Sequence, residues 1–65
     1  MANHVELYNS SAWRRVLRPA QLAREPLCRM CSELGITTAA TVVDHIDPHR
    51  GRVDKFYDPD NLQSL

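Results

Sequence analysis

The segment TVVDHIDPHRG, residues 41–51, places two aspartates and two histidines within eleven positions. Hydrolysis of a phosphodiester near neutral pH needs a base that deprotonates water and a divalent cation that neutralises developing negative charge. His45 is a candidate base because an imidazole titrates near the working pH. Asp44 is a candidate ligand for Mg²⁺ or Mn²⁺ because these hard cations prefer carboxylate oxygens. The segment therefore indicates this chemistry or, as the alternative, a polar strand end that caps the following loop.

The pleat of a β-strand sets a condition on that chemistry. Successive side chains of a regular strand point to opposite faces, so Asp44 and His45 can serve one phosphate only at a strand end or a twisted edge. The Asp47-Pro48 step favours a strand end there. For His49, in the loop that follows, surface exposure is the expectation and contact with phosphate is the functional alternative.

Cys28 and Cys31 form a Cys-x-x-Cys pair and are the only cysteines of the chain. Two thiolates at this spacing on a tight turn make one half of a tetrahedral zinc site. A structural zinc ion takes four ligands, and the other nitrogen candidates are His4, His45 and His49. A disulfide, a redox pair and a half-site completed from elsewhere are the open alternatives. The redox pair fits poorly, because such a pair should follow a strand and this one follows a predicted helix.

Positive charge gathers in the first half of a chain whose formal net charge is zero. Residues 1–31 carry a balance of +3 and residues 32–65 a balance of −3. Arg14, Arg15 and Arg18 fall on one face of a helix, because residues three and four positions apart are neighbours there. The planar guanidinium can bind two phosphate oxygens at once. These arginines are thus candidate DNA contacts, with a solvated helix surface as the plain alternative.

The length of 65 residues limits the chain to one domain with a marginal core, so a metal, a disulfide or a partner should add stability. Its 43% apolar and 25% charged residues are typical of a folded protein. No run approaches the ~20 apolar residues of a membrane-spanning helix, and the N-terminus lacks the apolar core of a secretory signal. We therefore expect no membrane partner and a reducing, cytoplasmic compartment.

Helical spacing of apolar residues dominates the first half of the chain. Ser10 or Ser11 can cap a helix that places Trp13 in the core. Pro19 either kinks this helix or begins a second one, which Pro26 ends. The residues expected to face inward, fully or in part, are Val16, Leu17, Ala20, Leu22 and Ala23.

The second half of the chain predicts a strand and a loop. β-Branched residues predict the strand over residues 40–46. Prolines and Gly51 mark a loop after it, from which the aromatic pair 56–57 packs back onto the domain. Residue 60 or 61 is expected to cap a helix that begins at Leu62.

Three motifs in this order, Cys28-x-x-Cys31, VVDHIDPHRG and DPDNLQSL, resemble the small HNH endonucleases of bacteria and bacteriophages. The resemblance runs from about Tyr8 to Leu65, nearly the whole chain. It implies a small α+β fold with N-terminal helices, a zinc-knuckle turn and a ββα-metal motif.

The resemblance also implies roles for single residues. His45 matches the first His of the motif and would be the general base, while Asp44 matches the acid before it and would ligate a catalytic divalent ion, Mg²⁺, Mn²⁺ or another. Asn61 matches the motif's Asn, whose side chain pins the loop and so keeps His45 oriented. Cys28 and Cys31 match the first pair of a four-cysteine structural Zn²⁺ site. The candidate DNA-binding residues are Arg14, Arg15, Arg18 and a His-Arg pair that often follows the motif, His49 and Arg50.

The sequence departs from the family pattern at its end. In the family, the segment resembling NLQSL runs into a second Cys-x-x-Cys and the motif's final His, which ligates the catalytic ion from the closing helix. This sequence stops at Leu65. We therefore expect residues 1–65 to be the N-terminal portion of a single HNH nuclease domain, with residues 1–9 flexible, the closing helix largely absent, and little activity for this chain alone.

The expected function is that of a metal-dependent endonuclease or nickase acting on double-stranded DNA in the cytoplasm of a bacterial host. Family members encoded near phage packaging genes point to packaging proteins as a partner, and a homodimer is a further expectation. The alternative is a non-catalytic, zinc-stabilised module that binds nucleic acid or protein. In that alternative two copies share one ion through Cys28 and Cys31.

Overall fold

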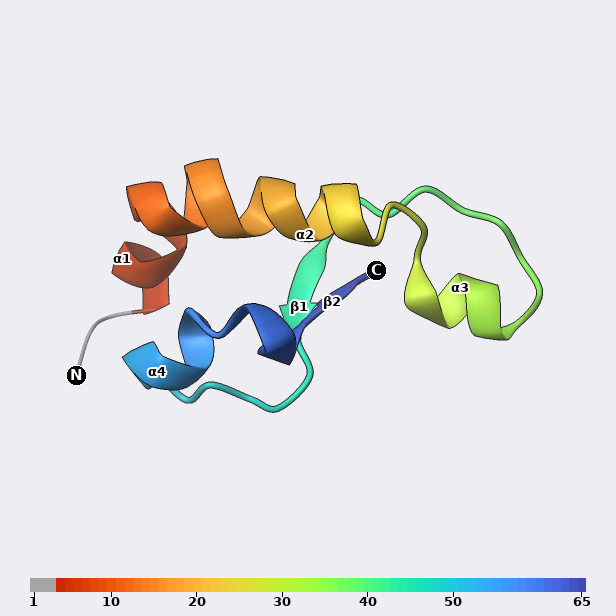
Figure 1. Cartoon of the computed structure of the whole chain (residues 1–65). Helices are drawn as coiled ribbons and strands as arrows, with labels where there is room; N and C mark the ends of the chain where they lie inside the picture. Colours follow the sequence, from red (N-terminus) through yellow and green to blue (C-terminus); the bar gives the residue numbers. More distant parts are fainter. Residues whose placement is uncertain (1–3) are drawn as a thin grey trace.

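A computed structural model of the chain describes residues 4–65. It combines short helices with one two-stranded antiparallel sheet, so the predicted small α+β class is confirmed. Figure 1 shows a long helical segment whose C-terminal end lies over the two strands, with α1 and α4 near one end of the molecule and α3 at the other. The elements in chain order are α1 (His4–Asn9), the π-helix η1 (Ala12–Leu17), α2 (Arg18–Arg24), α3 (Arg29–Glu33), β1 (Val43–His45), α4 (Val53–Phe56), the 3₁₀ helix η2 (Pro59–Asn61) and β2 (Leu62–Ser64).

Helical structure begins before the predicted cap. The hydroxyl of Ser10 does accept a hydrogen bond from the backbone N–H of Trp13, at 3.3 Å, as the capping prediction requires. However, α1 precedes it and occupies residues for which flexibility was expected. That expectation for residues 1–9 stays a prediction, and residues 1–3 lie outside the described part of the chain.

The helix widens just before Pro19. The backbone N–H of Arg18 donates to the carbonyl of Trp13, five residues back. The proline ring crowds the carbonyl four residues before it and offers no N–H, so a π-type turn accommodates it. The wider turn moves the inward face forward: Gln21 is 2% exposed, whereas Ala20 and Ala23 are exposed. The prediction that these two alanines face inward is therefore wrong, and so is the same prediction for Val16, which is 61% exposed.

The core joins the N-terminal helices to the sheet and α4. Its buried cluster contains Leu7, Trp13, Val43, Phe56 and Leu62. Phe56 is fully buried, and Tyr57 packs against the same cluster, so the predictions for Trp13 and for the aromatic pair are confirmed.

The sheet pairs the predicted strand with the end of the chain. Val43 lies opposite Ser64, and His45 lies opposite Leu62. The strand β1 is shorter than the predicted range 40–46. The prediction of a helix that begins at Leu62 is wrong, because that residue begins β2. The reason is local: Asp58 accepts the N–H of Asp60 at 2.9 Å and caps only the short η2 turn. The side chains of Leu62 and Ser64 then bury themselves on one face with the period of two typical of a strand.

None of the helices within residues 4–65 is long and apolar enough to cross a membrane.

Candidate functional site

Asp44, His45 and His49 line one cavity of about 330 Å³. The cavity lies where α1, the end of β1 and the loop leading to α4 meet. Its other lining residues are His4, Tyr8, Pro48 and Arg50.

The strand end brings Asp44 and His45 to this cavity. Along β1 burial alternates, with Val43 buried, Asp44 exposed and His45 buried, as the pleat requires. The strand stops at His45 and the chain bends over the next two residues, so both side chains still reach the same cavity. Asp44 and His45 therefore border one cavity at a strand end, the position at which the pleat allows neighbouring residues to act together. Asp44 also turns back on its own chain, because its Oδ1 accepts the backbone N–H of His45 at 2.9 Å.

The imidazole of His45 is held in one orientation. Its Nε2 lies 3.1 Å from the carbonyl oxygen of Phe56. A carbonyl only accepts hydrogen bonds, so Nε2 carries the proton and Nδ1 is the basic nitrogen of the neutral ring. The ring stacks on Trp13 with 5.4 Å between centroids and 20° between planes, and His45 is 7% exposed. Packing and hydrogen bonding therefore fix both the tautomer and the position of the ring.

Asn61 joins the two segments that flank the cavity. Its Oδ1 accepts the backbone N–H of Asp47 at 2.8 Å, and its Nδ2 donates to the carbonyl of Asp47 at 2.9 Å and to that of Lys55 at 3.3 Å. Lys55 directly precedes Phe56, whose carbonyl holds His45. Through these bonds Asn61, at the end of η2, ties the backbone at Asp47 to the end of α4 that contacts the imidazole.

His49 is buried, contrary to the expectation of surface exposure, and is 7% exposed. Its Nδ1 accepts the backbone N–H of Gly51 at 3.0 Å, and its Nε2 lies 3.2 Å from the hydroxyl of Tyr8. Burial lowers the pKa of His49, and the neighbouring His45 and His4 lower it further. The physical reason for its burial is the turn at Arg50 and Gly51, both with positive φ, which folds the imidazole back under α1.

Tyr8 is a site residue that sequence reasoning missed. It reaches the cavity from α1, a helix that the apolar spacing did not predict. Burial raises the pKa of Tyr8, and the negative charge of Asp44 raises it further. The sequence offered no signal for this contact, because Tyr8 and His49 are 41 positions apart.

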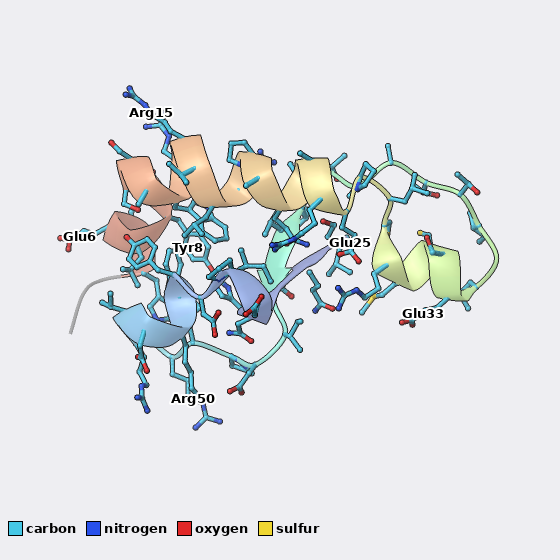
Figure 2. The ribbon with its side chains drawn as sticks, viewed as in Figure 1. Glu6, Tyr8, Arg15, Glu25, Glu33 and Arg50 are labelled. Carbon is cyan, nitrogen blue, oxygen red and sulfur yellow. The ribbon has the colours of Figure 1, made fainter. Side chains whose placement is uncertain are left out.

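The predicted arginine ridge does not line this cavity. Arg14, Arg15 and Arg18 are all exposed, and Figure 2 shows Arg15 pointing away from Tyr8 and from the elements below the helix. Arg18 donates to the carbonyl of Thr41 at 3.0 Å. Arg50 is the arginine that lines the cavity.

Cys28 and Cys31 lie on the turn at which α3 begins. Both thiols are free, and the Cys28 sulfur accepts the backbone N–H of Cys31 at 3.4 Å where α3 begins. This bond, followed by one from the Cys31 thiol, lowers the pKa of Cys28. Gly35, with a φ of 77°, closes the turn.

The described part of the chain groups no further metal ligands with these two sulfurs. The site histidines lie near α1, whereas Figure 1 places α3 at the opposite end of the molecule. Within residues 4–65, no three His, Cys, Asp or Glu side chains are grouped to hold a metal ion. The described residues therefore place two cysteine sulfurs at the start of α3 and one carboxylate, that of Asp44, at the cavity.

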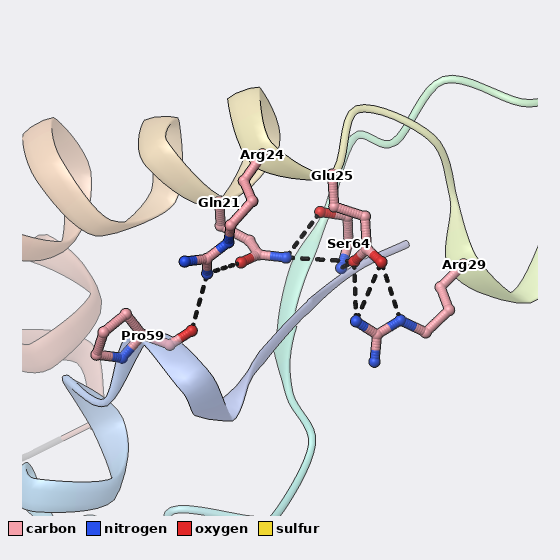
Figure 3. Close-up of polar contacts among 6 residues, drawn as sticks. All are labelled: Gln21, Arg24, Glu25, Arg29, Pro59 and Ser64. Carbon is pink, nitrogen blue, oxygen red and sulfur yellow. Dashed lines mark hydrogen bonds and ion pairs between the residues drawn. The ribbon is translucent and has the colours of Figure 1, made fainter.

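A second polar cluster, shown in Figure 3, ties α2 to β2 and α3. Glu25 accepts the backbone N–H of Ser64 at 2.7 Å and pairs with Arg29 at 3.0 Å. The bond from Ser64 lowers the pKa of Glu25 against the opposing effect of burial, and Arg29 lowers it further. Buried Gln21 donates to both Glu25 and the Ser64 hydroxyl, each at 3.2 Å. Arg24 contacts Gln21 and donates to the carbonyl of Pro59 at 2.9 Å, which completes the cluster.

Comparison with known proteins identifies a structural relative. No model of a protein family matches the chain, and no curated protein sequence matches it. A solved structure, the HNH endonuclease of the deep-sea thermophilic bacteriophage GVE2 with manganese ion, matches with a TM-score of 0.81 and 42% sequence identity. The match covers 94% of this chain and 66% of the GVE2 protein, so the chain spans just under two thirds of that protein's length. A likeness this strong in both sequence and backbone, over almost all of its residues, makes the chain a member of the HNH endonuclease family.

Proposed function

We propose that the chain carries the base and one metal ligand of a metal-dependent DNA endonuclease or nickase. The observation that carries the proposal is the cavity that Asp44 and His45 share at the end of β1. The GVE2 relative, solved with manganese, supports the same class of reaction.

His45 is the base in this proposal. Its Nε2 is committed to the Phe56 carbonyl, so the ring has one basic nitrogen left, Nδ1, to take a proton from water. The stacked Trp13 and the Phe56 carbonyl prevent the ring from turning, and Asn61 supports that carbonyl through Lys55. The neutral imidazole is thereby oriented before substrate binds.

Asp44 is the metal ligand in this proposal. Its Oδ1 is engaged by the backbone N–H of His45, which leaves Oδ2 for Mg²⁺, Mn²⁺ or another hard cation. A bound divalent cation would supply charge neutralisation at the scissile phosphate. A single carboxylate binds a hydrated cation weakly, so we expect low metal affinity and little activity for this chain alone.

Double-stranded DNA is the proposed substrate. Arg50 borders the cavity and can bind a phosphate next to the reacting one, while Arg14, Arg15 and Arg18 would contact the backbone farther away. His49 was predicted as a DNA contact, and its burial favours a supporting role instead. Packaging proteins and a homodimer remain predictions.

The proposal is tested by nicking of supercoiled plasmid in excess Mn²⁺ with three proteins: wild type, Asp44→Ala and His45→Ala. We expect both substitutions to abolish the nicking that the wild type shows, by at least the ~100-fold typical of a lost general base. A matched control is Asp58→Ala, which removes a carboxylate that only caps η2. Wild-type nicking that persists in Asp44→Ala would refute the assignment.

The free thiols favour a second candidate, a zinc-stabilised binding module. The hydrogen bonds to the Cys28 sulfur favour a thiolate there, and a thiolate pair is half of a tetrahedral zinc site. Two copies of the chain can complete that site by sharing one ion. Zinc stoichiometry and mass decide: one Zn²⁺ per two chains, in a dimer that a chelator splits, favours the binding module, whereas a monomer that does not retain zinc excludes the shared ion.

A further inference from the structure

We propose that Tyr8 is a further residue of the nuclease centre, whose hydroxyl donates a hydrogen bond to a non-bridging oxygen of the bound phosphodiester, and that His49 is its positioning residue. This inference rests on the proposed function. It concerns two residues that line the cavity but are neither the base nor the metal ligand of that function.

The hydrogen bonds of His49 determine which way its contact with Tyr8 runs. A backbone N–H can only donate, so the bond from Gly51 at 3.0 Å makes Nδ1 of His49 an acceptor without a proton. The neutral ring then carries its proton on Nε2. The 3.2 Å contact is therefore a hydrogen bond from Nε2 of His49 to the hydroxyl oxygen of Tyr8.

This direction leaves the Tyr8 proton available. The hydroxyl oxygen accepts from His49, so its own O–H is free to donate elsewhere. Among residues 4–65 no other group forms a hydrogen bond with that hydroxyl. Tyr8 lines the same cavity as Asp44 and His45, and it is 38% exposed, so solvent and ligands can reach it.

The surroundings keep both groups in the required protonation state. The raised pKa of Tyr8 keeps its proton on the hydroxyl at neutral pH, and the lowered pKa of His49 keeps the imidazole neutral. The Tyr8 ring also packs edge-on against Phe56 and Trp13, with centroids 4.9 and 5.4 Å away, which fixes its direction. A fixed neutral donor beside a cation site is suited to stabilise charge that develops on a phosphate.

The chemistry of the cavity selects the ligand class. Its charged and polar lining combines the Arg50 guanidinium, the Tyr8 hydroxyl and a carboxylate suited to a cation. Two donors and a cation ligand around about 330 Å³ match a phosphodiester group, which is anionic and offers two non-bridging oxygens.

The test combines a structural and a catalytic readout. The first is the tautomer of His49 in the wild-type protein, read from the ¹⁵N chemical shifts of its ring at neutral pH. We expect the proton on Nε2. A proton on Nδ1, or a protonated imidazolium, would overturn the inference whether or not the protein is active.

The second readout is plasmid nicking in Mn²⁺ by Tyr8→Phe, which keeps the aromatic packing and removes the hydroxyl. We expect kcat to fall about 100-fold, the effect of removing one donor to developing charge, with little change in KM or in thermal stability. The matched control is Tyr57→Phe, which loses a 2.8 Å bond to Ser10 outside the cavity and should keep full activity. His49→Gln keeps an N–H donor for Tyr8 and should retain more activity than His49→Ala.

The outcomes distinguish failure of the Tyr8 inference from failure of the proposed function. If Asp44→Ala abolishes nicking and Tyr8→Phe does not reduce it, only the Tyr8 inference fails. If Asp44→Ala nicks as fast as the wild type, the proposed function fails, and the Tyr8 inference, which rests on it, fails as well.

Discussion

His45 and His49 are two of the three histidines that line the cavity, and their hydrogen bonds give them different roles. Both neutral rings carry the proton on Nε2, because His45 faces a carbonyl there and His49 accepts a backbone N–H at Nδ1. Of these two, His45 is therefore the one that keeps an unoccupied basic nitrogen. This distinction, and not the residue type, assigns the base to position 45.

Asn61 gives a test of how the base is supported. Asn61→Ala removes three hydrogen bonds around the cavity. We expect it to lower the free energy of unfolding by about 1–3 kcal/mol and to reduce plasmid nicking further than this loss of folded protein explains. Urea unfolding and nicking rates measure the two effects.

Asn9→Ala is the matched control, because Asn9 is exposed at the end of α1. It should leave both quantities close to wild type. Nicking by Asn61→Ala at the wild-type rate would show that Asn61 does not support the base.

Glu25 gives a prediction on pH. The bond from the Ser64 N–H, with help from Arg29, holds the pKa of this carboxyl below its ordinary value of 4.5. A lowered pKa in the folded state adds stability that is fully present above the unfolded pKa and is lost as pH falls through the folded pKa. Glu25→Gln should therefore cost up to about 3 kcal/mol at pH 7 and much less at pH 3.

Urea unfolding at the two pH values measures this difference. Glu33→Gln is the matched control, since Glu33 is exposed and forms no ion pair within residues 4–65. Equal losses for Glu25→Gln at both pH values would contradict the role of the ionised carboxylate.

At the scale of elements, the features that depend on neighbouring residues could be predicted from the sequence. The features that depend on contacts between distant residues could not. Capping by Ser10, burial of Trp13 and a strand through Val43 follow from neighbouring residues, and the structure has all three. The buried Gln21 could not be predicted from a regular helical period, because the π-turn before Pro19 shifts the inward face.

The strand at Leu62 was missed for a related reason. A turn signal can cap a full helix or a single 3₁₀ turn, and pairing with His45 across the sheet decides between them here. The residues around the cavity divide in the same way. The motif singled out the neighbours Asp44 and His45, which both line the cavity, whereas the burial of His49 and its contact with Tyr8 depend on α1. Tertiary contacts of this kind are outside the reach of spacing alone.

The cysteine turn has its own test at Gly35. This residue has a φ of 77° and no atom within 4 Å of the position that a Cβ would take. Gly35→Ala should therefore destabilise through the backbone alone, by about 1 kcal/mol, and Gly35→Asn should cost less because asparagine tolerates this conformation. Urea unfolding ranks the two variants, and an equal or reversed order would show that the left-handed backbone does not matter here.

At the scale of the molecule, the arginine that borders the cavity comes from the acidic half of the chain and not from the basic half. Arg50 of the acidic half borders the cavity, and Arg15 of the basic half points away from it. Arg14→Ala should weaken DNA binding uniformly across sequences and reduce the slope of log affinity against log salt by about 1, as for one lost phosphate contact.

Binding measured in EDTA, where cleavage is suppressed, at several salt concentrations checks this slope. Arg52→Ala is the matched control, because that guanidinium pairs with Asp54 at 2.9 Å. A slope unchanged in Arg14→Ala would assign the helix arginines to a solvated surface.

The central claim is that Asp44 and His45 converge on one cation. Paramagnetic broadening of NMR signals by trace Mn²⁺ tests it directly, without requiring cleavage. We predict that the signals of Asp44, His45 and the neighbouring cavity residues broaden first in the wild type, and that Asp44→Asn abolishes this broadening. Broadening centred elsewhere, or unchanged in Asp44→Asn, would contradict the account.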